Sequence, residues 1–135
     1  MRAAIVLVCL LLGAGCDESS PVGPTVGLNE RFTLAPAEVA VIRDAGLRVE
    51  FVEVSGDSRC PADVLCIQGG DALVHIRVIE GNASSSYELH TGDSNRAAIV
   101  HGSVRIALAE LQPYPFSTRT IAPGEYRATF TASRV

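Results

Sequence analysis

Short runs in which apolar and polar residues alternate recur along most of the chain. Leu47, Val49 and Phe51, for example, are separated by Arg48 and Glu50. A period of two places every second side chain on the same face of a strand, so the pattern predicts strands with one buried face. The clear runs are Leu47–Val54, Ala72–Ile79, Val104–Leu108 and Tyr126–Ser133, and the weaker runs are Phe32–Leu34, Glu38–Ile42, Ser85–His90 and Ala97–His101.

No segment carries a sustained apolar stripe with the period of a helix. Ser103–Leu111 offers a short helical alternative, but its β-branched start and its alternation favour a strand. Turn residues separate the runs at Asp44–Gly46, at Gly81–Asn82 and at Pro123–Gly124. Many short strands between turns predict an all-β fold over residues 31–135. The expected form is an antiparallel β-sandwich or an Ig-like barrel of about eight strands.

The amino terminus has a different composition from the rest of the chain. Arg2 supplies one positive charge, residues 3–12 are all apolar, and the small residues Gly13–Gly15 follow. This is the plan of an export signal, so residues 1–15 are predicted to be a signal peptide that forms a short helix. The apolar stretch is shorter than the about 20 residues that a membrane-spanning helix needs.

The end of this signal, Leu12-Gly13-Ala14-Gly15-Cys16, resembles the lipobox of bacterial lipoproteins. The resemblance implies that the signal is removed before Cys16, that the cysteine sulfur carries a diacylglycerol, and that the new amino terminus is acylated, with palmitate as the expected acid. The expected location is then the bacterial cell envelope. Two or more acyl chains on Cys16 would meet the condition for stable membrane anchoring. The alternative is an ordinary secretory signal in which Cys16 has no role.

A segment with the composition of a linker follows the cysteine. Asp17–Glu30 contains two prolines, two glycines, two serines and three acidic residues, and it has no periodicity. Residues 16–30 are therefore expected to be an acylated cysteine and a flexible tether. The tether would hold a single β domain, residues 31–135, near the lipid.

Composition and charge narrow the class of protein. The 135 residues are enough for one domain. With 47% hydrophobic and 19% charged residues, the sequence is too apolar to be disordered. All 11 basic residues are arginine, and 15 acidic residues leave a net charge of -4. A nucleic-acid partner is therefore not expected.

Two cysteines, Cys60 and Cys66, remain in the expected domain. Because exported domains keep disulfides, one bridge that closes a short loop is the first interpretation. Such a bridge contributes about 2.4 kcal/mol by the chain-entropy relation. The alternative is a metal site that also uses His75, His90 or His101, but the cysteine spacing does not fit a paired zinc motif and no histidine is close in sequence. No metal and no other cofactor is therefore expected.

The sequence around the first of these cysteines resembles a signature of small exported bacterial domains to which no activity is assigned. The resemblance rests on Asp57–Pro61, on Cys66 and on Ala72, with a glycine before the last of these. Pro113–Pro115 and the run that starts at Tyr126 are similar as well. The resemblance implies a β domain with a disulfide loop.

Asp57, Arg59 and Asp63 surround the expected bridge and are the candidate binding residues. Rigid loops on a β scaffold often carry function, which favours a recognition loop. The alternative is internal: Arg59 pairs with Asp57 or with a carbonyl group and fixes the loop. The aromatic segment Pro113–Phe116 is either a partner-binding edge or, as we favour, a crossing that packs on the core.

Catalysis is only weakly indicated. Gly-Asp-Ser strings occur at Gly56–Ser58 and at Gly92–Ser94, and His90 and Asp93 lie near Ser94, which suggests a triad. Turns, however, favour the same residue types for their backbone conformations. The chain is therefore not expected to be an enzyme.

The expected function is that of a lipid-anchored envelope protein whose β domain binds or spaces an unknown ligand through its loops without catalysis. The expected partners are the membrane, through the lipid anchor, and an unknown ligand for which a protein is one candidate. One alternative is a protease inhibitor that presents the disulfide loop to a protease cleft. A further alternative is a metal-binding or hydrolytic envelope protein.

Overall fold

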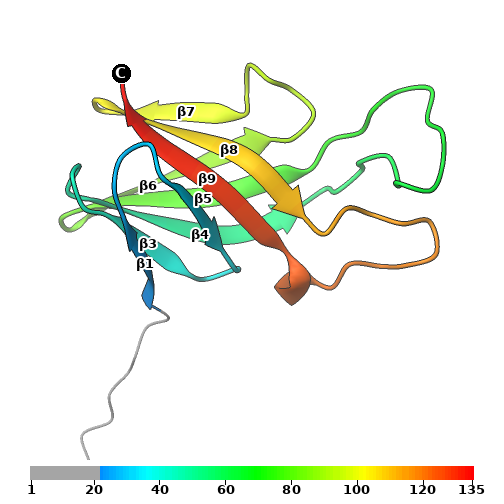
Figure 1. The fold of residues 1–135 in the computed structure, drawn as a ribbon, viewed down its shortest axis with the longest axis horizontal. Coiled ribbons are helices and arrows are strands. Elements are labelled where there is room, and N and C mark those ends of the chain that lie inside the picture. Colours follow the sequence, from blue (N-terminus) through cyan, green and yellow to red (C-terminus); the bar gives the residue numbers. More distant parts are fainter. Residues whose placement is uncertain (1–21) are drawn as a thin grey trace, which may run out of the picture.

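Two β-sheets stacked face to face make up residues 22–135, the part of the chain that the computed structural model describes (Figure 1). The strand order is β1-β3-β4-β5-β6 in one sheet and β2-β9-β8-β7 in the other. The predicted all-β sandwich is confirmed, and both sheets are open rather than joined into a barrel. The elements are β1 (Val22–Val26), β2 (Arg31–Leu34), β3 (Val39–Ile42), β4 (Leu47–Ser55), β5 (Leu73–Glu80), β6 (Ala83–His90), β7 (Ala98–His101), β8 (Val104–Gln112), the 3-10 turn η1 (Pro123–Glu125) and β9 (Arg127–Arg134).

The predicted tether over residues 16–30 is wrong for its second half, because Val22–Val26 form β1. This strand pairs with β3 in parallel, so the five-stranded sheet is mixed rather than purely antiparallel. Pro24 is tolerated because β1 is an edge strand. A side chain at Gly23 would meet the carbonyl oxygen of Val39 at 2.6 Å, so the glycine permits the close approach of the two strands. Val26, at the end of β1, is buried in the core.

The alternation read from the sequence places the core between the two sheets. Along β4 the side chains of Leu47, Val49 and Phe51 are buried, and β4 is the central strand of its sheet. The rings of Phe51 and Phe32 both contact that of Phe130 on β9, with centroid distances of 6.3 and 5.7 Å. The segment with the helical alternative, Ser103–Leu111, lies almost entirely in β8 and is a strand.

Two-residue turns close the hairpins of the sandwich at the end away from the disulfide loop. Gly81 and Asn82 connect β5 to β6, as the sequence predicts, and Gly102 and Ser103 connect β7 to β8. Gly81 and Gly102 have φ of 58° and 60°, which a hairpin turn of type II′ needs at its first central position.

Two long connections project from the opposite end of the sandwich (Figure 1). The first joins β4 to β5 and contains Cys60 and Cys66, and the second joins β8 to β9 and contains the aromatic segment 113–116. The two connections lie side by side and are joined by a hydrogen bond in which the backbone N–H of Ala62 donates to the carbonyl oxygen of Pro115 at 2.8 Å.

Residues 22–135 contain no helix long and apolar enough to cross a membrane. The predicted signal peptide, its helix and Cys16 lie outside the described residues.

Candidate functional site

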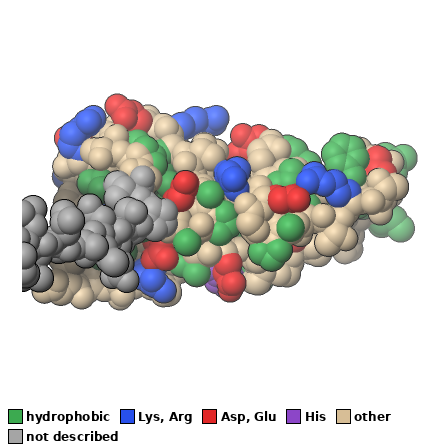
Figure 2. Space-filling view, turned by 90° about the horizontal axis from the view of Figure 1, so that it is seen from below, with side chains coloured by type: hydrophobic (Ala, Val, Ile, Leu, Met, Phe, Trp, Pro, Cys, Tyr) green, Lys and Arg blue, Asp and Glu red, His purple; other side chains and the backbone are tan. Residues whose placement is uncertain are grey.

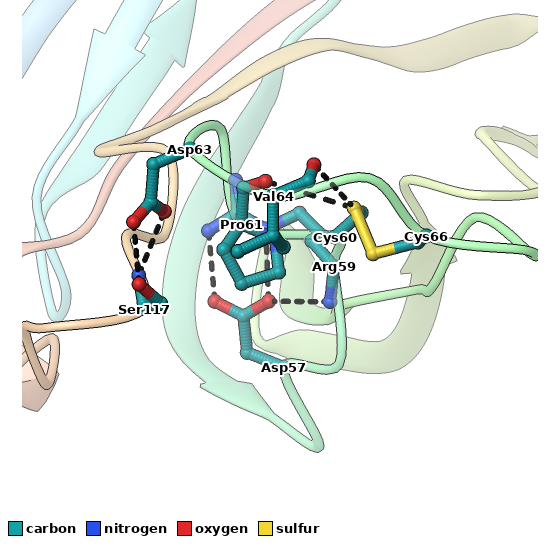
Figure 3. The surroundings of a disulfide bond; sticks show 8 residues. All are labelled: Asp57, Arg59, Cys60, Pro61, Asp63, Val64, Cys66 and Ser117. Atoms are coloured by element: carbon teal, nitrogen blue, oxygen red, sulfur yellow. Dashed lines mark hydrogen bonds and ion pairs between the residues drawn. A yellow bond between two sulfur atoms is a disulfide. The ribbon is translucent and has the colours of Figure 1, made fainter.

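A disulfide joins Cys60 to Cys66, as the sequence predicts, and closes the loop between β4 and β5 (Figure 3). Their Cα atoms are 6.0 Å apart. The bridge occupies both thiols, so neither cysteine is a metal ligand. It holds a loop that projects beyond both sheets and has little core of its own.

Arg59 forms an ion pair with Asp57 at the base of this loop (Figure 3). The guanidinium Nε and Nη2 donate to the two carboxylate oxygens, both at 2.8 Å. Its Nη1 and Nη2 also donate to the carbonyl oxygens of Leu111 and Pro113, at 2.8 and 2.9 Å. The side chains of Arg59 and Asp57 are 9% and 12% exposed. The structure therefore agrees with the second interpretation of Arg59, the internal ion pair. The same side chain ties the loop to the end of β8 through its bond to Leu111.

The hydroxyl of Tyr126 completes the pairing of the Asp57 carboxylate by donating to it at 2.9 Å. Burial raises the pKa of Asp57, but the hydrogen bonds from Arg59 and Tyr126 and the charge of Arg59 outweigh it, so this pKa lies below its ordinary value. Burial and the bond to the carboxylate raise the pKa of Tyr126 to about 12. Both shifts favour the ionised carboxylate and the neutral phenol.

The raised pKa of Tyr126 predicts a loss of stability in alkali. A phenol with a folded-state pKa above its unfolded value stabilises the protein below that value, and the contribution is lost as the pH rises through the folded-state pKa. The pKa rises from an ordinary value of 10.0 to about 12, so this stability is lost at alkaline pH, between these two values. The difference in phenolate absorbance between the native chain and a Tyr126→Phe variant should therefore have its midpoint near pH 12. A difference spectrum with its midpoint at the ordinary value would contradict the bond to Asp57.

Asp63 attaches the loop to its neighbour at a second place (Figure 3). Its carboxylate accepts hydrogen bonds from the backbone N–H of Ser117, at 2.9 Å, and from the Ser117 hydroxyl. These bonds lower the pKa of Asp63. The third candidate binding residue is thus exposed at the surface, but its charge is used within the molecule.

Ser58, Asp71 and Gly70 close the base of the loop. The backbone N–H and the hydroxyl of Ser58 both donate to the carbonyl oxygen of Asp71, at 2.7 and 2.9 Å. Gly70 crosses Ser58 so closely that an added Cβ would lie 1.5 Å from the Ser58 carbonyl oxygen. The disulfide, the Arg59 pair, the Asp63 bonds and this crossing together fix the loop.

The part of the loop that faces solvent is apolar. Leu65 and Ile67 are 103% and 105% exposed, and Val64 is 42% exposed. We call these three residues the apolar tip. Tyr114 and Phe116, on the neighbouring connection, are each about half exposed beside it. Figure 2 shows hydrophobic side chains gathered at the end of the molecule that projects beyond the sheets.

Sequence reasoning did not single out the apolar tip. It selected the charged residues that surround the bridge, because rigid loops on a β scaffold often carry function. The signal that was available is the position of Val64, Leu65 and Ile67 within and just after a short disulfide loop. Apolar side chains in so short a loop have no core of their own to enter.

A cavity of about 300 Å³ lies behind the loop, against β8. Arg59, His90, Tyr114 and Glu110 are among the residues that line it. The hydrogen-bonding groups of Arg59 are already paired with Asp57 and backbone carbonyls, so the cavity offers few free groups with which to orient a small ligand.

The suggested catalytic residues are not assembled as a triad in residues 22–135. The ring nitrogens of His90 contact the carboxylates of Asp71 and Glu88 rather than Ser94. Burial raises the pKa of Asp71, but hydrogen bonds from the Gly92 N–H and from His90 outweigh it and lower the pKa. The carboxylate of Asp93 accepts a hydrogen bond from the backbone N–H of Asn95, a contact typical of a turn. The Gly-Asp-Ser strings therefore serve local structure.

The histidines also lie apart from one another and from the disulfide. His75 contacts Ser55 on the outer face of β4 and β5, and His101 contacts Tyr87 and Glu80 between β6 and β7. Within residues 22–135, no group of three or more His, Cys, Asp or Glu side chains is arranged to hold a metal ion.

Comparisons with known proteins add no relative. No protein family, no curated protein and no solved structure matches this chain significantly. The function is therefore inferred from the sequence and from the geometry of the disulfide loop.

Proposed function

We propose that this chain is a lipoprotein of the bacterial cell envelope, anchored through an acylated Cys16, and that its β-sandwich is a non-enzymatic binding domain. The lipobox-like sequence before Cys16 supports the anchor. The Cys60–Cys66 disulfide supports export, because such bonds persist in oxidising compartments.

With Cys16 as the anchor, the domain would lie close to the lipid, because β1 already begins at Val22. Only five residues, 17–21, separate Cys16 from this strand. A chain of that length spans at most about 18 Å. After removal of residues 1–15, which contain Arg2, the chain has 10 basic and 15 acidic residues and a net charge of -5. Anionic headgroups would repel such a domain rather than hold it flat.

The observation that carries the binding function is the exposure of Leu65 and Ile67. Two fully exposed large apolar side chains on one rigid loop are unusual for a surface that meets only water. The side chains of Arg59 and Asp57 act beneath this surface and fix its shape. Binding then costs less conformational entropy, because the disulfide and the attachments of Arg59 and Asp63 already hold the loop.

Replacing Cys16 with serine is expected to move the protein out of the membrane fraction, because the acyl chains have no other attachment point. Cys9→Ser is the matched control: Cys9 lies inside the predicted signal peptide and would be removed with it. Fractionation, labelling with palmitate and mass spectrometry of the mature protein check the result. Cleavage at another bond, or a native protein with an unmodified Cys16, would contradict the proposal.

A further inference from the structure

In the part of the chain that the structure describes, the loop leaves its backbone groups unpaired from Leu65 to Gly69, whereas the Val64 N–H donates to the carbonyl oxygen of Pro61 at 3.2 Å. Within residues 22–135, Leu65–Gly69 make no backbone hydrogen bond with another backbone group. Residues 62–69 are all exposed. The segment therefore offers a partner two kinds of contact at once, unpaired N–H and C=O groups and apolar side chains.

The two fully exposed residues of the tip flank a cysteine of the bridge in the sequence. Leu65 precedes Cys66 and Ile67 follows it, and the sulfur of Cys66 is bonded to that of Cys60 (Figure 3). The two exposed apolar side chains are thus two positions apart, with the residue between them tied back to the loop. A peptide read by main-chain pairing and by pockets for alternate side chains has this pattern.

A lipid surface fits these groups poorly. Unpaired backbone groups cost several kcal/mol each in hydrocarbon, where nothing can pair with them. Between Arg59 and Arg77 the chain also has no Lys or Arg with which to contact phosphate headgroups. A protein groove satisfies the backbone groups and buries the side chains, so the observations favour a protein partner.

We infer that the partner is an endopeptidase with a hydrophobic primary specificity pocket, and that the loop binds in its cleft as an inhibitor, with Leu65 in that pocket. This inference rests on the proposed binding function. Endopeptidase clefts pair with the backbone of a peptide and seat alternate side chains, which the tip supplies. The disulfide and the attachments at Arg59 and Asp63 hold both sides of the segment in place. The neighbouring Tyr114 and Phe116, each about half exposed, add apolar surface on the adjacent connection.

Inhibition of chymotrypsin and trypsin by the full-length lipoprotein in detergent tests the inference. Chymotrypsin has a hydrophobic primary pocket and trypsin has an acidic one. The native chain should inhibit chymotrypsin at about 1 μM or below and should not inhibit trypsin. Leu65→Arg should reverse this preference and weaken the inhibition of chymotrypsin at least about tenfold. Val100→Arg, at an exposed position on β7, is the matched control and should leave inhibition unchanged.

Several results would overturn the inference. These are the absence of chymotrypsin inhibition at about 100 μM, rapid cleavage of the loop with loss of inhibition, or a switch to trypsin produced by Ile67→Arg and not by Leu65→Arg. The chain contains no tryptophan, so an Ile67→Trp variant reports on the tip alone. A blue shift of its emission with phosphatidylcholine vesicles would overturn the inference in favour of lipid. The fractionation of the Cys16→Ser variant tests the lipid anchor independently. A failure of the inhibition test would therefore not count against the proposed anchor.

Discussion

Replacing Arg59 with alanine is expected to lower the free energy of unfolding by about 3–5 kcal/mol. The substitution leaves the Asp57 carboxylate largely buried, with only the hydroxyl of Tyr126 as a side-chain partner. It also removes the donors to the carbonyl oxygens of Leu111 and Pro113. Removing one partner of a buried pair is severe because the charge that remains keeps its desolvation penalty.

Arg77→Ala is the matched control for this experiment. Arg77 pairs with Glu50 at the same 2.8 Å, but its side chain is 41% exposed on the outer face of the sheet. An exposed pair of this kind contributes about 0–1 kcal/mol. Urea unfolding followed by circular dichroism compares the two variants. Equal stabilities for Arg59→Ala and the native chain would show that the ion pair does not hold the loop.

The effect of Arg59→Ala should also depend on pH. The pKa of Asp57 is lowered in the folded chain. A carboxyl group of this kind adds stability above its unfolded pKa, here near 3.8, and loses it as the pH falls through the folded-state pKa. The difference between the native chain and Arg59→Ala is therefore expected to shrink as the pH falls below about 4.

The strands were predictable because their signal is local. Alternation identified the eight strands from β2 to β9. Strands such as β4, β5 and β9 bury one face, so the period of two is visible within a few residues. The turn at Gly81–Asn82 was visible for the same reason. β1 was missed because Val22–Val26 have the glycine and proline content of a linker, and only pairing with β3 makes them a strand. That pairing is a property of the sheet edge, which the local sequence does not reveal.

The site was less predictable than the fold because its contacts join distant segments. The role of Arg59 stayed open in the sequence because its decisive partners, the carbonyl groups of Leu111 and Pro113, are more than fifty residues away, with separations of 52 and 54. Asp63 and Ser117 are likewise 54 residues apart. The disulfide itself was predictable, because the predicted export and the spacing of the two cysteines indicate it without any knowledge of the surroundings.

Gly70→Ala is expected to destabilise the chain by about 3 kcal/mol or more. A Cβ at this position would lie 1.5 Å from the carbonyl oxygen of Ser58 and 2.9 Å from the backbone nitrogen of Arg59. Backbone atoms cannot rotate away as a side chain does, so the two segments that meet at the loop base would have to separate. The hydrogen bonds between Ser58 and Asp71 would be lost with them.

The adjacent glycine gives this prediction a close control. A Cβ at Gly69 would meet no atom within 4 Å. The free energy of unfolding of Gly69→Ala is therefore expected to lie within about 0.5 kcal/mol of that of the native chain. The two variants make the same chemical change at neighbouring positions of one loop. Urea unfolding that found them equally stable would show that the loop base is not closed at Ser58. If Gly70→Ala alone is destabilised, its inhibition of chymotrypsin should weaken as well, because the apolar tip depends on this base for its rigidity.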